Sequence, residues 1–280
     1  AQGIGARSNL WQSSRMCGRY AAAENPDELK MFLELPDQSL EPLPPNYNVA
    51  PTHPVYVVDE LSGERAMRIV SWGLIPSWAK DAKRPWPNAR ADTLAEKPSF
   101  RNAFAKTRCL VPASGWYEWQ SVNNTKQPFF FHRADHNPVV MAGLLEAWKN
   151  PDTGQWLRTM TLVTTDAASD LEYIHDRMPV VLERSEWSTW LSGQTSQQDL
   201  FKIMDPTAPS VIEAYPISTR VNKVGNNDSE LLVFQAPTGF AEAPAARADQ
   251  AAGEAPARPR GPRGAARRRV ARGARRRADR

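Results

Sequence analysis

The feature that most constrains the fold is a series of short β-prone runs, each bounded by proline, glycine or asparagine. The runs are rich in β-branched and aromatic residues, which favour strands, whereas the residues between them favour turns. They are VYVVDE (55–60), AMRIVSWG (66–73), RCLVPASGWYEWQ (108–120), QPFFFHRAD (127–135), PVVMAGLLEAW (138–148) and QWLRTMTLVTT (155–165). Because few long helical patterns separate these runs, the sequence predicts a largely antiparallel sheet or barrel.

Short helices are predicted around these strands. In NPDELKMFLEL (25–35), Asn25 can cap the first turn and Pro26 fits the first helical position, while Asp27 and Glu28 suit the positive end of the helix dipole. Three more segments have the pattern of short helices: SDLEYIHDRM (169–178), RSEWSTWLSG (184–193) and QQDLFKIMD (197–205). The expected fold class is therefore α+β, with a β core flanked by short helices.

The composition indicates a globular chain with its own core. Among its 280 residues, 41% are hydrophobic and ten are tryptophan, which is enough to bury a substantial core. No apolar run approaches the ~18–20 residues of a membrane span, and residues 1–15 lack the apolar centre of a secretory signal. Two cysteines, Cys17 and Cys109, are too few for a disulfide framework. We therefore expect a soluble, cytoplasmic protein with reduced thiols.

The net charge of +4 averages unlike parts of the chain. Residues 236–280 contain 12 arginines against 4 acidic residues, which gives +8. Residues 65–108 contain 10 basic and 3 acidic residues, which gives +7, so the rest of the chain carries −11. A basic stretch inside an otherwise acidic domain indicates a site for a polyanion such as nucleic acid.

The last 45 residues, 236–280, differ from everything before them. This Ala/Pro/Arg-rich segment has almost no large apolar side chains, so it cannot offset the entropy of ordering, and we expect it to be disordered. Its arginine clusters could bind nucleic acid non-specifically, and a solvated low-complexity tail is an equally good interpretation.

The stretch MCGRY (16–20) raises a chemical question about Cys17. If translation started at Met16 and that methionine were removed, Cys17 would carry an α-amine and a thiol on adjacent carbons. Such a 1,2-aminothiol condenses with an aldehyde to a five-membered thiazolidine. The alternative is an internal, buried and inert cysteine, which is how most free cysteines behave. Cys109, inside RCLVP, is predicted to be strand core.

A tryptophan-rich basic segment follows the second strand run. Trp72, Trp78 and Trp86 lie among basic residues and precede PNARADT (87–93), which holds Asn88 and Arg90; the basic residues before it are Lys80, Lys83 and Arg84. Aromatic faces stack nucleic-acid bases at ~1–3 kcal/mol each, and cations follow the phosphates of a single strand. In the alternative interpretation the tryptophans are core and the cations form a solvated rim.

Two further segments carry groups that could transfer protons. Glu118 lies between aromatics in GWYEWQ, where an apolar wall would raise its pKa, or else it is the solvent-facing member of a strand. His175 lies in a charged cluster in YIHDRMPVV, as a proton donor and acceptor or as a surface histidine. The other histidines lack metal-ligand spacing with either cysteine, so neither a zinc site nor another cofactor is expected.

Six blocks, in order, resemble the SOS response-associated peptidase (SRAP) family, whose members include shields of abasic sites in DNA. The blocks are MCGRY (16–20), YNVAPT (47–52), WGLIPSW (72–78), NARADT (88–93), GWYEW (115–119) and IHDRMP (174–179). The resemblance runs from Cys17 to about residue 235. It implies one compact domain with a central barrel-like, mostly antiparallel β core and a positively charged groove for single-stranded DNA.

The resemblance also implies roles for individual residues. The family's catalytic cysteine, asparagine, glutamate and histidine match Cys17, Asn88, Glu118 and His175. Its DNA-binding positions match four further residues, Arg19, Trp72, Arg90 and Arg177. The expected partner is single-stranded DNA containing abasic sites, bound by a monomer that joins the nucleoid. Asp92 stands where the family usually has glutamate, a change from which we expect little effect on the chemistry.

The front of the chain departs from the family, which needs its cysteine at the amino terminus. We therefore expect that residues 1–15 are an extension that is absent or removed in the active protein, by a start at Met16 or by autoprocessing, and that residues 16–235 form the SRAP domain. Three alternatives remain open. They are a cysteine peptidase using Cys17 and His175, a non-catalytic module for single-stranded DNA, and redox regulation through Cys17 and Cys109.

Overall fold

The computed structural model describes residues 17–122, 125–206 and 211–237. The first strand of the described chain belongs to a five-stranded antiparallel sheet. Its strand order is β12-β8-β7-β1-β2. The strands are β1 (Arg19–Ala22), β2 (Asn46–Val49), β7 (Gly115–Val122), β8 (Thr125–Arg133) and β12 (Ile212–Pro216). The expectations for residues 1–15 and for nearly all of the 236–280 tail lie outside the described residues.

The second sheet closes on itself. Its order is β11-β10-β4-β3-β6-β9, and β9 also pairs with β10, so that five strands form a ring, as the barrel-like prediction required. The strands are β3 (Pro54–Asp59), β4 (Ala66–Trp72), β6 (Arg108–Ala113), β9 (Val139–Lys149), β10 (Trp156–Asp166) and β11 (Arg177–Pro179), with β5 (Asn88–Arg90) beside β10. Most pairs are antiparallel, while β4 and β5 run parallel to β10.

The alternation of side chains along these strands divides the interior into two cores. In β6, Cys109 and Val111 belong to one apolar cluster, and Leu110 belongs to the other. In β3, Val57 and Val58 divide in the same way. Because side chains of a strand point alternately to its two faces, a strand covered on both faces is apolar throughout. Cys109 is thus part of the core, which confirms its prediction as a buried strand residue.

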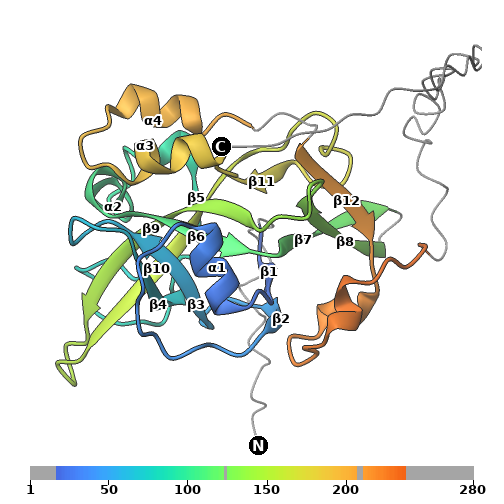
Figure 1. Cartoon of the computed structure of the whole chain (residues 1–280), viewed down its shortest axis with the longest axis horizontal. Helices are drawn as coiled ribbons and strands as arrows, with labels where there is room; N and C mark the ends of the chain where they lie inside the picture. Colours follow the sequence, from blue (N-terminus) through green and yellow to red (C-terminus); the bar gives the residue numbers. More distant parts are fainter. Residues whose placement is uncertain (1–16, 123–124, 207–210, 238–280) are drawn as a thin grey trace, which may run out of the picture. The chain divides into compact units, whose positions relative to one another are not determined.

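The helices cover the outside of the ring. Figure 1 shows α2, α3 and α4 gathered on one side of it. In α1, Asn25 accepts hydrogen bonds from the amides of Asp27 and Glu28, as its sequence predicted. Residues 184–191 and 197–203 are helical as expected. The helices are α1 (Pro26–Phe32), α2 (Arg101–Lys106), α3 (Trp187–Leu191) and α4 (Gln197–Ile203), with 3-10 turns η2 (Ala91–Thr93), η3 (Arg184–Glu186), η5 (Thr219–Asn222) and η6 (Ser229–Leu232).

The helix predicted for residues 169–178 is wrong. This segment forms successive turns and then enters β11, which pairs antiparallel with the end of β10. The amide of Ala167 donates to the carbonyl of Asp176, and Arg177–Pro179 are extended in β11, so both ends of the segment are tied to a strand pair and its last residues cannot be helical. Within the described ranges, no helix is long and apolar enough to cross a membrane.

The end of β10 organises the region where the predicted site residues meet. Residues 162–164 of β10 pair with β5 on one edge, and residues 164–166 pair with β11 on the other. β5 begins at Asn88, and β11 begins at Arg177, two residues after His175. β10 therefore pairs on its two edges with two of the sequence blocks, NARADT (88–93) and IHDRMP (174–179).

Candidate active site and nucleic-acid surface

Cys17 lies in the interior, directly before β1. Its side chain is only 2% exposed and belongs to the same apolar cluster as Trp72 and Trp116. Its carbonyl oxygen accepts a hydrogen bond of 2.8 Å from Nδ2 of Asn88. Because Asn88 is fixed by its pairing with Leu162 of β10, this hydrogen bond attaches Cys17 to the barrel.

Glu118 is buried rather than solvent-facing. It lies in β7 opposite Phe129, on the face of the strand that carries Trp116, while Tyr117 belongs to a separate apolar cluster. Both the thiol and the backbone amide of Cys17 hydrogen-bond to its carboxyl group. The Oε1 atom of Glu118 is buried and has no hydrogen-bond partner within the described part of the chain. A carboxyl oxygen in that position is available to a bound molecule.

Burial keeps both acidic groups of this pair protonated. Loss of solvent raises the pKa of Glu118 to about 8, although the hydrogen bonds from Cys17 work in the opposite direction. Burial also raises the pKa of the Cys17 thiol well above its usual range, and the nearby Glu118 adds to this effect. At neutral pH the site therefore holds a carboxylic acid next to a thiol, not a carboxylate next to a thiolate.

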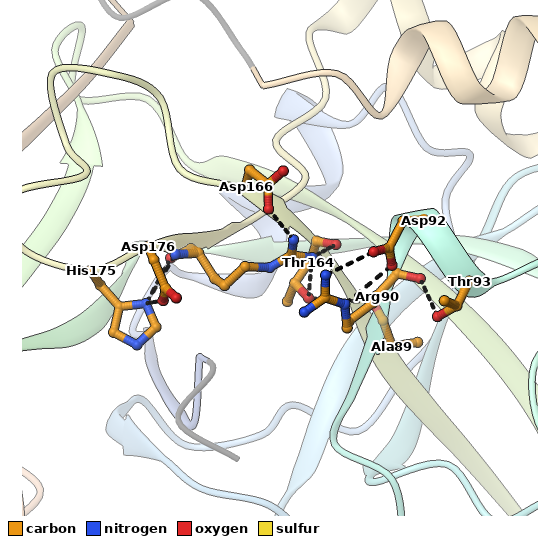
Figure 2. A network of polar contacts seen from close by, with 9 residues as sticks. Ala89, Arg90, Asp92, Thr93, Thr164, Asp166, His175 and Asp176 are labelled. Atoms are coloured by element: carbon orange, nitrogen blue, oxygen red, sulfur yellow. Dashed lines mark hydrogen bonds and ion pairs between the residues drawn. The ribbon is translucent and has the colours of Figure 1, made fainter.

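His175 approaches the same carboxyl group from the turn before β11. Its Nε2 atom lies 3.8 Å from Oε2 of Glu118. Its Nδ1 atom lies 3.1 Å from the amide nitrogen of Arg177 and 3.2 Å from the carbonyl oxygen of the same residue. Asp176 reaches the same Nδ1 at 3.3 Å (Figure 2). The backbone of Arg177 and the carboxylate of Asp176 thus hold one side of the ring, while the Nε2 side faces Glu118.

Arg177 and Arg90 lie on the two strands that flank the end of β10, each two residues after a member of this cluster, His175 or Asn88. The Arg177 guanidinium is buried, donates to the Thr164 carbonyl at 2.7 Å and forms an ion pair with Asp166. Arg90 is half-exposed and forms two hydrogen bonds, of 3.2 and 2.7 Å, to Asp92. Figure 2 shows Arg90 and Asp92 close to Thr164 and Asp166. Both of these predicted DNA-binding side chains are therefore ion-paired within the protein.

Trp72, one of the predicted DNA-binding residues, lies in the interior. Trp72 is completely buried, packs on Tyr20 with 5.0 Å between ring centroids, and donates from its indole nitrogen to the Pro87 carbonyl at 2.8 Å. No face of this ring is open to a base, so the predicted DNA contact of Trp72 is corrected to support of the residue before Asn88.

The contacts of Arg19 likewise point inward. Its guanidinium donates to Oδ1 of Asn48 at 2.8 Å and to the carbonyl of Val221 at 2.9 Å. Burial lowers the pKa of this arginine. These bonds tie β1 to β2 and to η5, and the DNA contact of Arg19 stays a prediction.

Other tryptophans of the basic segment face solvent. Trp78 is 64% exposed and Trp86 is 48% exposed, and together they line an open hollow of about 380 Å³. Basic side chains from the same loop line it too, namely Lys80, Lys83 and Arg84, with Asp81 among them. Trp148 of β9 holds this loop by donating to the Ala79 carbonyl at 2.7 Å. This is the mixture of aromatic faces and cations that a single strand of nucleic acid requires.

The structure thus brings together four of the predicted site residues and leaves others apart. Cys17, Asn88, Glu118 and His175 are linked by the contacts above, with Arg177 beside them. Sequence reasoning missed Asp166 and Thr164, which hold Arg177; both come at the end of a predicted strand, where only the register of β10 could have placed them. In the described ranges, no group of three or more His, Cys, Asp or Glu side chains could hold a metal ion.

A closed β ring, a largely buried cluster of Cys17, Glu118 and His175, and an exposed hollow lined by aromatic and basic side chains define the class: an α+β protein built on a β barrel. The chain belongs to the SOS response associated peptidase (SRAP) family, which residues 16–224 match.

Curated relatives of this chain share a descriptive name. This chain is 37% identical over 223 residues to "Abasic site processing protein YoqW" of Bacillus subtilis, and the alignment covers 78% of this chain and 99% of that protein. It is 31% identical over 262 residues to "Abasic site processing protein HMCES" of Xenopus tropicalis, covering 78% of each. A crystal structure of a protein from Bacteroides thetaiotaomicron superposes with a TM-score of 0.71 at 27% identity, covering 79% of this chain and 100% of that one.

Proposed function

We propose that this protein captures abasic sites in single-stranded DNA by forming a covalent thiazolidine through an N-terminal Cys17, which shields the damaged site. The relatives named as abasic site processing proteins support the substrate class. The observation that carries the chemistry is the position of Cys17, whose carbonyl is bound by Asn88 and whose thiol and amide nitrogen both meet the carboxyl group of Glu118.

The first step is opening of the sugar. An abasic deoxyribose interconverts between a closed hemiacetal and an open aldehyde, and only the aldehyde reacts with an amine. Glu118, protonated at neutral pH because burial raises its pKa to about 8, can donate a proton to the ring oxygen, and the carboxylate that results can take up the proton that leaves the anomeric hydroxyl. Its Oε1 atom, which has no partner among the described residues, is the oxygen available for this contact.

The second step forms the two new bonds. The α-amine of a terminal Cys17, with a reference pKa of about 7.7–8.0, attacks the aldehyde carbon, and the carbonyl oxygen leaves as water to give an imine. The Cys17 sulfur then adds to the imine carbon while its proton passes to the nitrogen, closing the ring. Glu118 receives and returns these protons, and the Nε2 atom of His175 lies 3.8 Å from it as the next member of the relay.

The proposal requires that the residues before Cys17 be absent in the reacting form. The amine would then lie where the Cys17 amide now meets Glu118. An internal cysteine offers no amine, and a terminal serine would close a less stable oxazolidine. Removal by autoprocessing is part of the proposal and agrees with the word "peptidase" in the family description.

The DNA would approach across the exposed hollow beside the pocket. Trp78 and Trp86 offer faces for stacking, and Lys80, Lys83 and Arg84 offer charge for the phosphates. Arg90 and Arg177, at the mouth of the pocket, would hold the phosphates next to the abasic sugar. A monomer in the cytoplasm, joining the nucleoid when bound, is sufficient for this activity.

The geometry favours this chemistry over a Cys17/His175 peptidase. The hydrogen-bond partner of the Cys17 thiol is Glu118, and burial raises the thiol pKa, whereas a thiol nucleophile of a peptidase needs a base that lowers it. A non-catalytic DNA-binding module would have no need for a buried acid next to a thiol.

A denaturing gel tests the proposal. Protein beginning at Cys17 is incubated with a labelled single strand containing one abasic site, and we expect a heat-stable adduct whose mass equals protein plus DNA less one water. The undamaged strand serves as the control and should give none. An equally stable adduct with Cys17→Ala would show that another group reacts.

A further inference from the structure

We propose that Asp166 and Asp92 are specificity-determining residues, which compete with DNA phosphates for Arg177 and Arg90 and so weaken the hold on intact DNA. This inference rests on the proposed function and adds a role for two acidic residues at the mouth of the pocket. Figure 2 shows both carboxylates and Arg90 around Thr164 of β10.

The pair formed by Arg177 and Asp166 is strongly asymmetric in burial. The arginine side chain is 7% exposed, whereas the aspartate side chain is 80% exposed. The two residues are cross-strand neighbours of β11 and β10. The carboxylate can therefore turn away into solvent without moving the backbone, while the guanidinium must stay where it is.

Arg177 does not depend on Asp166 for its position. A second nitrogen of its guanidinium donates to the carbonyl of Thr164 at 2.7 Å and lies 3.4 Å from the hydroxyl of the same residue. Its Nε atom is buried and has no hydrogen-bond partner among the described residues. A guanidinium fixed by the backbone and facing an exposed counter-ion is suited to exchange that counter-ion for another anion.

The pair formed by Arg90 and Asp92 has the same exchangeable character on the other edge of β10. Both side chains are half-exposed, and both carboxylate oxygens contact the guanidinium. The hydrogen bonds from Arg90 hold the pKa of Asp92 below its usual range, so the carboxylate is charged throughout the neutral region. An incoming phosphate must displace a fully ionised competitor.

The charges around the mouth do not favour an anion before exchange. Arg90 interacts electrostatically with Asp92, Asp166 and Asp176, and Asp92 interacts with both arginines. Three carboxylates therefore face two guanidinium groups. A phosphate gains little here, because each new ion pair replaces an existing one. Intact DNA is consequently released easily from the mouth of the pocket, whereas a damaged strand is retained by the covalent bond.

The test compares Asp166→Asn and Asp92→Asn with a matched control, Asp135→Asn. The control removes a carboxylate from a pair with the same two-residue spacing, Arg133–Asp135, which lines a different hollow. The measurement is the dissociation constant for an undamaged single-stranded oligonucleotide at two salt concentrations. We expect each of the first two variants to bind about 3- to 10-fold more tightly, with a steeper salt dependence, and the control to match wild type.

The outcomes separate this inference from the proposed function. If Asp166→Asn binds undamaged DNA as weakly as wild type, or more weakly, the carboxylate is not a competitor and the inference is overturned. Thermal unfolding checks that each variant is folded, and Asp92→Asn tests the same competition independently. Adduct formation on abasic DNA is measured in parallel; if wild type forms no adduct, the proposed function fails, while the order of affinities on undamaged DNA still decides the competition.

Discussion

The site around Cys17 and the hollow around Trp78 differ in their exposure to water, although the proposed function needs both. In the pocket, Cys17 and Glu118 are removed from water, and burial sets their protonation states. In the hollow, Trp78 and Trp86 remain exposed among cations whose charge salt would screen. Under the proposed function, the chemistry depends on side chains that the barrel keeps away from water, whereas recognition of DNA depends on side chains that one loop exposes to it.

Replacing Glu118 by Gln is expected to have the largest effect. The amide keeps the shape but can neither donate nor accept the proton needed for ring opening, so adduct formation should slow by roughly 10²–10⁴-fold. The measurement is the single-turnover rate with abasic single-stranded DNA. Glu213→Gln, at the exposed position of β12, is the control and should react like wild type. A change below threefold would remove Glu118 from the mechanism.

The pH dependence of stability tests the same residue without any substrate. Burial raises the pKa of Glu118 in the folded state to about 8, from ~4.3 in an unfolded chain. The stabilising contribution of the bound proton is therefore complete below the unfolded value. It is lost as the pH rises towards 8, by up to ~1.4 kcal/mol per pH unit.

Denaturant unfolding between about pH 5 and about pH 8 measures this loss. The free energy of unfolding should fall more steeply in wild type than in Glu118→Gln, which cannot ionise. Glu213→Gln should keep the wild-type slope. If the free energy of unfolding depends on pH equally in wild type and Glu118→Gln, the carboxyl group of Glu118 is not held in its protonated form by the fold.

Removing one aromatic face from the hollow should have a smaller effect, confined to binding. Trp78→Ala is expected to weaken binding of undamaged single-stranded DNA by ~1–3 kcal/mol, the contribution of one stacked base. With saturating abasic DNA, the adduct rate should stay near that of wild type. Trp156→Ala is the matched control, since Trp156 is equally exposed but lines another hollow. Equal losses from both variants would leave the Trp78 hollow without a special role.

The sequence predicted most of the strands because their boundaries depend on local chemistry. β-branched runs bounded by turn residues defined β3, β4 and β9, and Asn25 and Pro26 defined the start of α1. The closure of β9 onto β10 is a long-range pairing with no local signal. The turns at 169–178 were predicted to be helical because the apolar spacing of Leu171 and Ile174 resembles a helix, while the competing pairing of β11 with β10 is invisible in that window.

For the site, the sequence could identify residue types but not exposure. Glu118 between aromatics was recognisable, yet whether it faced the interior depended on the pairing of β7 with β1 and β8. The same limit explains Trp72, which shares its segment with the exposed Trp78 but lies on the inner face of β4. Asp166 carried no signal, because its role arises only from its pairing opposite Arg177.

The arrangement of β5 and β11 on the two edges of β10 has a consequence for motion. Backbone ladders fix the spacing between Asn88 and Arg177, so it changes only if a strand pair breaks. We therefore expect the framework of the pocket to be the same before and after a strand of DNA arrives. Under the proposed function, the adjustment falls on the DNA: its flexible phosphodiester chain would curve and turn the abasic sugar inward to reach the sulfur of Cys17.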